Sequence, residues 1–212
     1  MLIEYRRLVR ADADLLAEFL TADPWPFHSG AATDPARIRR KVRWGQYDNH
    51  RVRTFWMVVD GAEVGLIRIE LIDEMPRIDL RIRAAHRGRG LGTHAQRWLT
   101  DYLFGELPGL HRLEGPTRHD NHAMRRAFVA CGYTHEAQFR EAWPAPDGTL
   151  HDTVVYAILR REWEAARDTA DQCSRVSASR AATAASSSRD ASQAAVNRVT
   201  RSAASSSTAM IP

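Results

Sequence analysis

Three glycines, Gly88, Gly90 and Gly92, stand at every second position between two regular patterns. Apolar and charged residues alternate over 77–82, which predicts a strand, and the apolar residues of 91–103 fall on one face of a helix. Glycine has no side chain to pack and loses much conformational entropy on folding, so three of them indicate a tight strand-to-helix turn with exposed backbone. This turn restricts the fold more than any other segment does.

Three interpretations of the turn are open. Its N–H groups and the positive end of the following helix suit a phosphate, with Arg87 and Arg89 adding charge at the rim. Residues 90–95 also satisfy the dinucleotide pattern G-x-G-x-x-A, and Glu114 follows about 20 residues later. The third interpretation is a plain turn. A dinucleotide fold needs several strand–helix units after the glycines, and only one follows here, so the phosphate site is favoured.

Strand and helix patterns alternate along the chain. The Asp60-Gly61 pair predicts a hairpin turn, because both residues tolerate a positive φ, and Pro35 behind Asp34 predicts a helix start. The expected strands are 2–9, the hairpin 54–71, 77–82, 111–117 and a closing pair at 133–143 and 151–163; the expected helices are 11–20, 34–45, 91–103 and 120–132. This order predicts one mixed α/β domain over 1–165, with an antiparallel sheet first and helical crossovers later.

The excess positive charge lies at the end of the chain. The net charge is +4 and the pI about 9.5, but residues 174–212 hold five arginines and one acid, so 1–173 is neutral. A nucleic-acid-binding domain normally presents a basic face, so we expect no nucleic-acid binding by the domain. Residues 166–212 are rich in Ala, Ser and Arg and poor in large apolar residues, which predicts a disordered tail.

Cysteine content and hydropathy favour a cytoplasmic protein. Cys131 and Cys173 are the only cysteines, too few for a disulfide framework. We find no signal peptide and no apolar run long enough to span a bilayer, and we expect no membrane association.

The segment RGRGLG, residues 87–92, resembles the Q/R-x-x-G-x-G/A signature of the GNAT superfamily of N-acetyltransferases, and residues 112–163 resemble its branch that acetylates ribosomal-protein N-termini. The resemblance spans about residues 1–165. It implies a mostly antiparallel central sheet flanked by helices, in which two strands separate after a bulge, here between 77–82 and 111–117. It also implies acetyl-coenzyme A as co-substrate and direct attack of a neutral primary amine on the thioester.

The cofactor contacts that the resemblance implies are Arg87, Gly88, Arg89, Gly90, Leu91, Gly92, Thr93 and Asn121. Backbone amides of the glycine turn would bind the pyrophosphate. Thr93 has an alternative role in the helix start, and Asn121 an alternative role as helix cap.

Direct attack requires a group that takes a proton from the amine. Asp79 in the third strand is the first candidate and Glu70 the second, each acting directly or through water; the alternative for Asp79 is a solvent-facing strand charge. Phe128 and Met124 occupy positions where relatives carry a tyrosine or a serine as proton donor. Tyr133 could replace them or belong to the core, and otherwise solvent protonates the departing thiolate.

The acceptor pocket is expected to be aromatic and partly apolar. Trp25, Phe27 and His28 lie in an early loop interrupted by prolines, and Trp143 lies in the last hairpin. The alternative role of the early-loop residues is anchoring of the loop against the core. The His and Asp residues of 119–122 straddle a helix start without ligand spacing, so we expect no metal site.

We therefore expect an N-acetyltransferase that acts on a small-molecule amine or a protein N-terminus. Two alternatives stay open. The first is a catalytically inactive acyl-CoA-binding sensor, since the usual proton donors are missing, and the second is an RNA-associated module that uses the arginines of the tail. The sequence does not determine the oligomeric state, and a homodimer is among the options.

Overall fold

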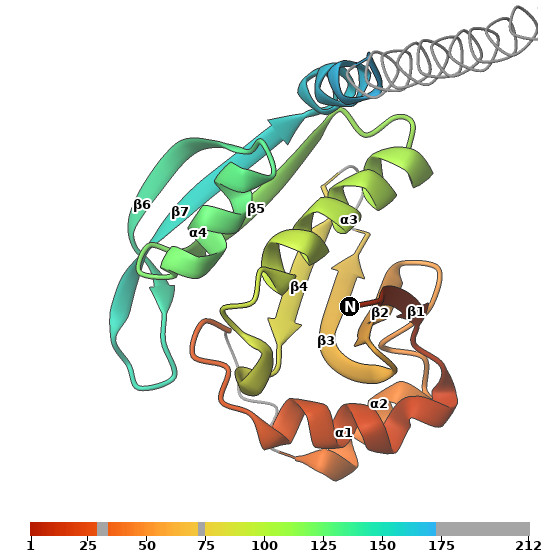
Figure 1. Ribbon diagram of the computed structural model, residues 1–212. Helices are drawn as coiled ribbons and strands as arrows, with labels where there is room; N and C mark the ends of the chain where they lie inside the picture. Colours follow the sequence, from red (N-terminus) through yellow and green to blue (C-terminus); the bar gives the residue numbers. More distant parts are fainter. Residues whose placement is uncertain (29–33, 72–74, 173–212) are drawn as a thin grey trace, which may run out of the picture. The chain divides into compact units, whose positions relative to one another are not determined.

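The computed structural model describes residues 1–28, 34–71 and 75–172, and divides the chain into Met1–Trp163 and a second unit from Glu164 onward (Figure 1). Residues 160–172 are helical, so the last predicted strand ends earlier than expected and the tail is not disordered from residue 166. The stretch contains several Ala, Glu and Arg residues, which are strong helix formers. The remaining prediction of disorder falls on 173–212, outside the described residues.

The first unit contains two separate antiparallel sheets. The first has the order β1-β2-β3-β4 and the second the order β5-β7-β6. The strands are β1 Ile3–Arg7, β2 Val52–Val59, β3 Ala62–Glu70, β4 Arg77–Ile82, β5 Arg112–Arg118, β6 Thr134–Pro144 and β7 Leu150–Leu159. The helices are α1 Ala13–Ala22, α2 Pro35–Arg43, α3 Leu91–Glu106 and α4 His122–Ala130, with short 3₁₀ turns at Arg10–Asp12 and Ala84–His86. The predicted order of elements is confirmed.

Local signals place the element boundaries. The side chain of Asp34 accepts a hydrogen bond from the Ala36 N–H at 2.9 Å, so it caps α2 as predicted. Asp60 and Gly61 have φ angles of 48° and 87°, as a tight hairpin turn requires. Gly132, at φ 85°, follows α4 in the left-handed conformation that ends many helices.

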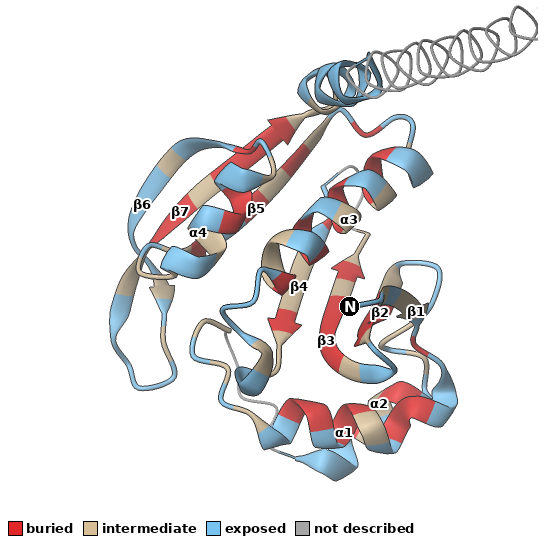
Figure 2. Cartoon of the chain, in the orientation of Figure 1, coloured by how far each residue is buried: buried red, intermediate tan, exposed pale blue. Residues whose placement is uncertain are grey.

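The first sheet is buried on both faces. In β2, Trp56 and Val58 pack with α1 and α2, while Phe55 and Met57 face the cluster that contains α3 and residues of the second sheet. All four side chains are almost fully buried. Figure 2 shows that much of β3, and of β7 in the second sheet, is also buried, whereas β6 is mostly exposed. Apolar side chains at every position of such a strand are expected when both faces are covered.

The separation predicted between the strands 77–82 and 111–117 is present, since these strands are β4 and β5. Among the described residues, β4 pairs only with β3 and β5 pairs only with β7, so each strand has one edge without a strand partner there. The implied bulge is not in β4, whose pairing with β3 runs regularly from Gly65–Ile82 to Glu70–Arg77; the register shift in this sheet lies in β2 at Met57 and Val58.

Because Gly115 has no side chain, the ring of Phe128 packs directly against β5 beside this gap. A Cβ added to Gly115 in β5 would lie 2.2 Å from the ring of Phe128, which is only 3% exposed and packs between Tyr133 and Tyr156. The ring therefore occupies the space that any larger residue would need.

Replacing Gly115 with Ala should lower the free energy of unfolding by about 1–3 kcal/mol, because a buried ring must leave its position. Gly105→Ala in α3 is the matched control, since nothing lies within 4 Å of its added Cβ. That control should raise stability by about 0.5–1 kcal/mol through helix propensity. Urea denaturation measures both, and equal effects of the two changes would contradict the packing argument.

Candidate functional site

The glycine turn leads into α3, where the N–H groups of 91–93 have no acceptor among the described residues. Gly88 and Gly90 have φ angles of 77° and 79°, and Gly90 precedes α3 without a side chain to cap it. The N–H groups of 91–93 belong to the first helical turn, which has no intrahelical acceptor for them. A Cβ added to Gly88, Gly90 or Gly92 would meet nothing within 4 Å, so open space adjoins these donors. The arrangement is suited to bind an anion.

A cavity of about 360 Å³ adjoins the turn. We call it the loop cavity; its wall includes the turn, the end of β4, the start of α4 and the segment 25–28. A second cavity of about 210 Å³, the cleft cavity, is lined by parts of β4, β5, α3 and α4 and by Trp143. Six residues line both cavities, so the two adjoin: Phe27, His28, Leu80, Arg81, Asn121 and Met124.

Arg87 does not stand free at the rim of the turn. Its Nε donates to the carbonyl oxygen of Ile82 at 2.9 Å, its Nη2 donates to that of Pro24 at 3.1 Å, and its guanidinium lies 5.4 Å from the Trp25 ring centre. The side chain therefore anchors the segment 24–28, and Arg87 contributes to the turn by its position in the backbone.

Two other arginines are available as cations. Arg89 is exposed, Arg126 of α4 lines the loop cavity, and neither makes a hydrogen bond or ion pair within the described part of the chain. The sequence analysis missed Arg126. The signal was its place on α4 near Ala123 and Ala127, two small residues that also line the loop cavity and leave room beside the long side chain.

Asn121 caps α4 as well as lining both cavities. Its Oδ1 accepts from the Met124 N–H at 3.3 Å, and its Nδ2 donates to Thr117 Oγ1 at 3.0 Å. Thr93 lines the loop cavity, and its carbonyl oxygen accepts a contact of 3.4 Å from the Cys131 thiol. The helix-start roles of Asn121 and Thr93 are thus compatible with the predicted cofactor roles.

Asp79 lies in the cleft cavity with its oxygens occupied. Arg81 approaches from two residues further along β4, with Nε at 3.0 Å and 3.1 Å from the two oxygens and Nη2 at 2.9 Å. His28 Nε2 lies 3.1 Å from Oδ1. Burial raises the pKa of Asp79, but the hydrogen bond from His28 and the charge of Arg81 outweigh it and hold the pKa well below its usual range. Such a carboxylate is a weak proton acceptor.

Glu70, the second candidate, is not brought to the site. It lines neither cavity, and its carboxylate pairs with Arg68 at 2.7 Å. Glu70 is at the end of β3, as predicted. It pairs with Arg77, the first residue of β4, so it lies beside the β3–β4 connection. Glu70 is therefore removed from the list of candidate bases.

The predicted aromatic wall is present, with its members divided between the cavities. Phe27 lines both cavities, Trp143 lines the cleft cavity and Trp25 the loop cavity. Trp25 also has the anchoring role, since its indole N–H donates to the Leu20 carbonyl oxygen at 3.0 Å. Arg118 holds the segment from the β5 side, with Nη1 at 3.1 Å from the Pro26 carbonyl oxygen.

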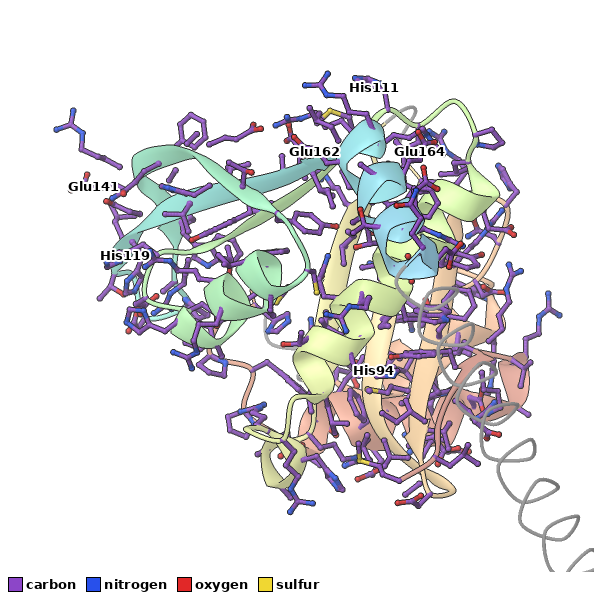
Figure 3. The ribbon with its side chains drawn as sticks, turned by 45° about the horizontal axis from the view of Figure 1, so that its top comes forward. His94, His111, His119, Glu141, Glu162 and Glu164 are labelled. Carbon is purple, nitrogen blue, oxygen red and sulfur yellow. The ribbon has the colours of Figure 1, made fainter. Side chains whose placement is uncertain are left out.

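A bulge in β6 directs Trp143 toward the cleft cavity. The register between β6 and β7 shifts between Phe139 and Trp143, and Glu141 has a φ of 53°. Asp152 fixes this end of the sheet: its Oδ1 accepts from the Glu141 N–H at 3.0 Å, and its carbonyl oxygen accepts from the His119 N–H at 2.9 Å. Figure 3 shows His119 and Glu141 at the same end of the second sheet. Bulges commonly redirect a side chain in this way.

No hydroxyl group stands at the expected proton-donor positions. Phe128 and Met124 both line the cleft cavity. Tyr133 belongs to the core, since it is 3% exposed and its hydroxyl contacts Gln96 Nε2 and Thr100 Oγ1 at 2.9 Å each. Burial raises the pKa of Tyr133 to about 12.

Within the described ranges, no group of three or more His, Cys, Asp or Glu side chains could hold a metal ion. The same ranges contain no helix that is both long and apolar enough to cross a membrane.

Comparisons with known proteins agree with this geometry. A family model described as an acetyltransferase (GNAT) domain matches residues 3–134. YdaF of Bacillus subtilis (strain 168), whose name describes a ribosomal N-acetyltransferase, is 28% identical over an alignment of 173 residues that covers 76% of this chain and 93% of YdaF.

Two solved structures share the fold. RimL, a ribosomal L7/L12 α-N-protein acetyltransferase in complex with coenzyme A, matches with a TM-score of 0.66 and 16% identity, over 74% of this chain and 93% of RimL. A dodecameric spermidine N-acetyltransferase from Vibrio cholerae matches with a TM-score of 0.64 and 18% identity, over 76% of this chain and 95% of that chain.

The ion pair between the buried Arg81 and the half-buried Asp79 predicts a pH-dependent contribution to stability. Asp79→Asn should lower the free energy of unfolding by about 2 kcal/mol at pH 7, because Arg81 loses its counterion. The folded pKa of Asp79 lies below the unfolded one, so this contribution is complete above about pH 5 and decreases as the pH falls below about 4. Urea denaturation of both proteins from pH 7 to pH 3 measures it. A difference that stays constant over this range would contradict the prediction.

Proposed function

Since the chain belongs to the GNAT family of acetyltransferases, we propose that it transfers an acetyl group from acetyl-coenzyme A to a primary amine that enters the cleft cavity. The observation that carries the proposal is the junction of the two cavities. At one of them lies a helix start whose N–H groups have no acceptor among the described residues, and at the other lies an aromatic lining with a carboxylate.

The residues present fit the cofactor. The N–H groups of 91–93 would bind its pyrophosphate, with Arg89 and Arg126 as nearby cations. The edges of β4 and β5 that have no strand partner offer backbone groups to the amides of its pantetheine arm. When bound, the thioester supplies an activated acetyl group. The amine must be neutral to attack it, so this chain has to remove a proton.

The departing sulfur needs a proton from another source. Neither Phe128 nor Met124 carries an ionisable hydrogen, and the hydroxyl of Tyr133 is held in the core. We propose that water supplies this proton. A catalytically inactive sensor is the second candidate function, favoured by the same two residues, and turnover separates the two. The RNA-binding alternative depends on tail residues outside the described part of the chain.

The charges of the cleft cavity favour an acceptor with a single amino group. Asp79 is the one acidic residue in its described lining, and Arg81 neutralises it. The other charges of a polyamine would need further carboxylates. Phe27, Trp143 and Phe128 suit an apolar body next to the amino group. We therefore propose a protein N-terminus or an apolar monoamine as acceptor, and not a polyamine.

The proposed function predicts turnover of acetyl-coenzyme A with suitable amines. Release of free thiol is measured with short peptides that begin with Ala, Ser or Phe, with phenethylamine, and with spermidine. We expect the peptides or phenethylamine to react with a kcat/KM at least about tenfold above that of spermidine. Coenzyme A binding without turnover of any amine would favour the sensor.

A charge placed in the anion site should separate binding from stability. Gly92 lies in the first turn of α3, where an acidic side chain stabilises a helix, so Gly92→Asp should unfold no more easily than the wild type. The same carboxylate repels the pyrophosphate, and the affinity for coenzyme A should fall by about 100-fold. Gly92→Asn has the same shape without charge and should lose much less. Calorimetry gives the affinities, and equal losses for the two variants would contradict the anion site.

A further inference from the structure

His28 is held by two acceptors at the same ring nitrogen. Its Nε2 hydrogen-bonds to the carbonyl oxygen of Leu80 at 3.1 Å and lies 3.1 Å from Oδ1 of Asp79. A carbonyl oxygen can only accept, so Nε2 carries the hydrogen. In the neutral ring, the lone pair is then on Nδ1.

Among the described residues, nothing donates a hydrogen bond to this lone pair. The Nδ1 atom is buried and has no hydrogen bond within the described residues, while the His28 ring lines both cavities where they adjoin. A buried acceptor without a donor costs about 1–3 kcal/mol. A ligand that supplies a hydrogen-bond donor at the junction of the two cavities would remove this cost. The N–H group of an acceptor amine is such a donor.

The environment of Asp79 argues against a direct role as base. Both of its oxygens accept from Arg81, and one of them also faces His28 Nε2. Its negative charge is instead placed to stabilise a positive charge on the His28 ring. A carboxylate beside one nitrogen and a free lone pair on the other is the arrangement by which an imidazole serves as general base.

We propose that His28 Nδ1 accepts the proton of the attacking amine, and that Asp79 is a positioning residue that supports the charged ring. The inference rests on the proposed acetyltransferase function. As the amine nitrogen bonds to the acetyl carbon, one N–H bond breaks and its proton forms a new bond to Nδ1. The electron pair of the C–S bond leaves with the sulfur, which takes a proton from water, and the ring later returns its proton to water.

Few other groups near the ring change charge. Asp79 and its partner Arg81 approach the His28 ring from β4. The guanidinium of Arg118 in β5 lies 5.0 Å from the ring centre of the adjacent Phe27. The guanidinium of Arg87 packs on Trp25. The arginines stay protonated throughout the working range.

Two further titratable groups lie in the surroundings. The hydroxyl of Tyr47 interacts with Asp79 and Arg81, and burial raises its pKa. His86 lines the loop cavity and not the cleft cavity. A general base has to be unprotonated to act, which gives a pH–rate profile an acidic limb.

The tautomer is tested without turnover. Long-range ¹H–¹⁵N correlation NMR of the wild-type protein, with the signals assigned by their absence in His28→Gln, should show the neutral His28 ring protonated on Nε2. Protonation on Nδ1 would overturn the proposal, because that nitrogen would then have no lone pair for the amine.

Kinetics test the role itself. His28→Gln should lower kcat by about 100-fold or more and remove the acidic limb, while the affinity for coenzyme A stays within about twofold. His111→Gln is the matched control, since His111 is exposed and lines neither cavity, and it should behave as the wild type. Asp79→Asn should lose less activity than His28→Gln, and its acidic limb should move to lower pH, because the charged ring loses its counterion.

The outcomes separate the two claims. This inference would be overturned if the His28→Gln enzyme kept the wild-type pH profile. It would also be overturned if the Asp79→Asn enzyme lost the acidic limb while the His28→Gln enzyme kept it. Either result would leave the acetyltransferase function intact. A wild-type protein that binds coenzyme A and acetylates no amine would overturn the proposed function, and the role of His28 with it.

Discussion

The missing hydrogen bonds between β4 and β5 are the constraint on which the rest of the site depends. In the part of the chain that the structure describes, each of these strands has a partner on one side only, so the sheet that a chain of this order could have formed is divided in two. Unpaired backbone edges inside a protein are costly unless something covers them. Phe128, set into the space over Gly115, and the segment 24–28 supply part of the cover, and the two cavities are what remains.

Arginine side chains fix the residues on both sides of the gap between β4 and β5 by hydrogen bonds. Arg87 and Arg118 reach the carbonyl oxygens of Pro24 and Pro26 from the two sides of the gap, and Arg81 fixes Asp79 beside His28. Each guanidinium combines hydrogen bonds with an aromatic or carboxylate contact, which a lysine could not reproduce. The segment 24–28 is thus positioned by cations from the glycine turn and from β5.

Much of the fold could be predicted because its signals are local. The Asp60-Gly61 turn, the Asp34 cap and the glycines before α3 each require a conformation that the neighbouring residues determine, and the structure agrees. The bulge at Glu141 and the helix over 160–172 were not predicted. The first is set by a hydrogen bond to Asp152, eleven residues further along, and the second continues directly from a strand without a breaking residue.

The site was predicted less well because pairing across the chain decides it. In the sequence, Arg87 is one of two arginines next to glycines, and only the fold shows that it is bonded to Pro24. Asp79 has the position of a base, but the sequence does not show that Arg81 and His28 occupy its oxygens. Glu70 differs from Asp79 only in its distance along the sheet, which depends on the register of β3 and β4.

The attachment of the segment 24–28 has a consequence for how specificity can change. Arg87 and Arg118 grip main-chain oxygens at Pro24 and Pro26, which every amino acid supplies, while positions 27 and 28 contribute the side chains that face the junction of the cavities. These two main-chain hydrogen bonds therefore do not require particular side chains at positions 27 and 28. Such a division of labour lets selection, or an engineer, exchange the recognition surface while the anchoring framework stays the same.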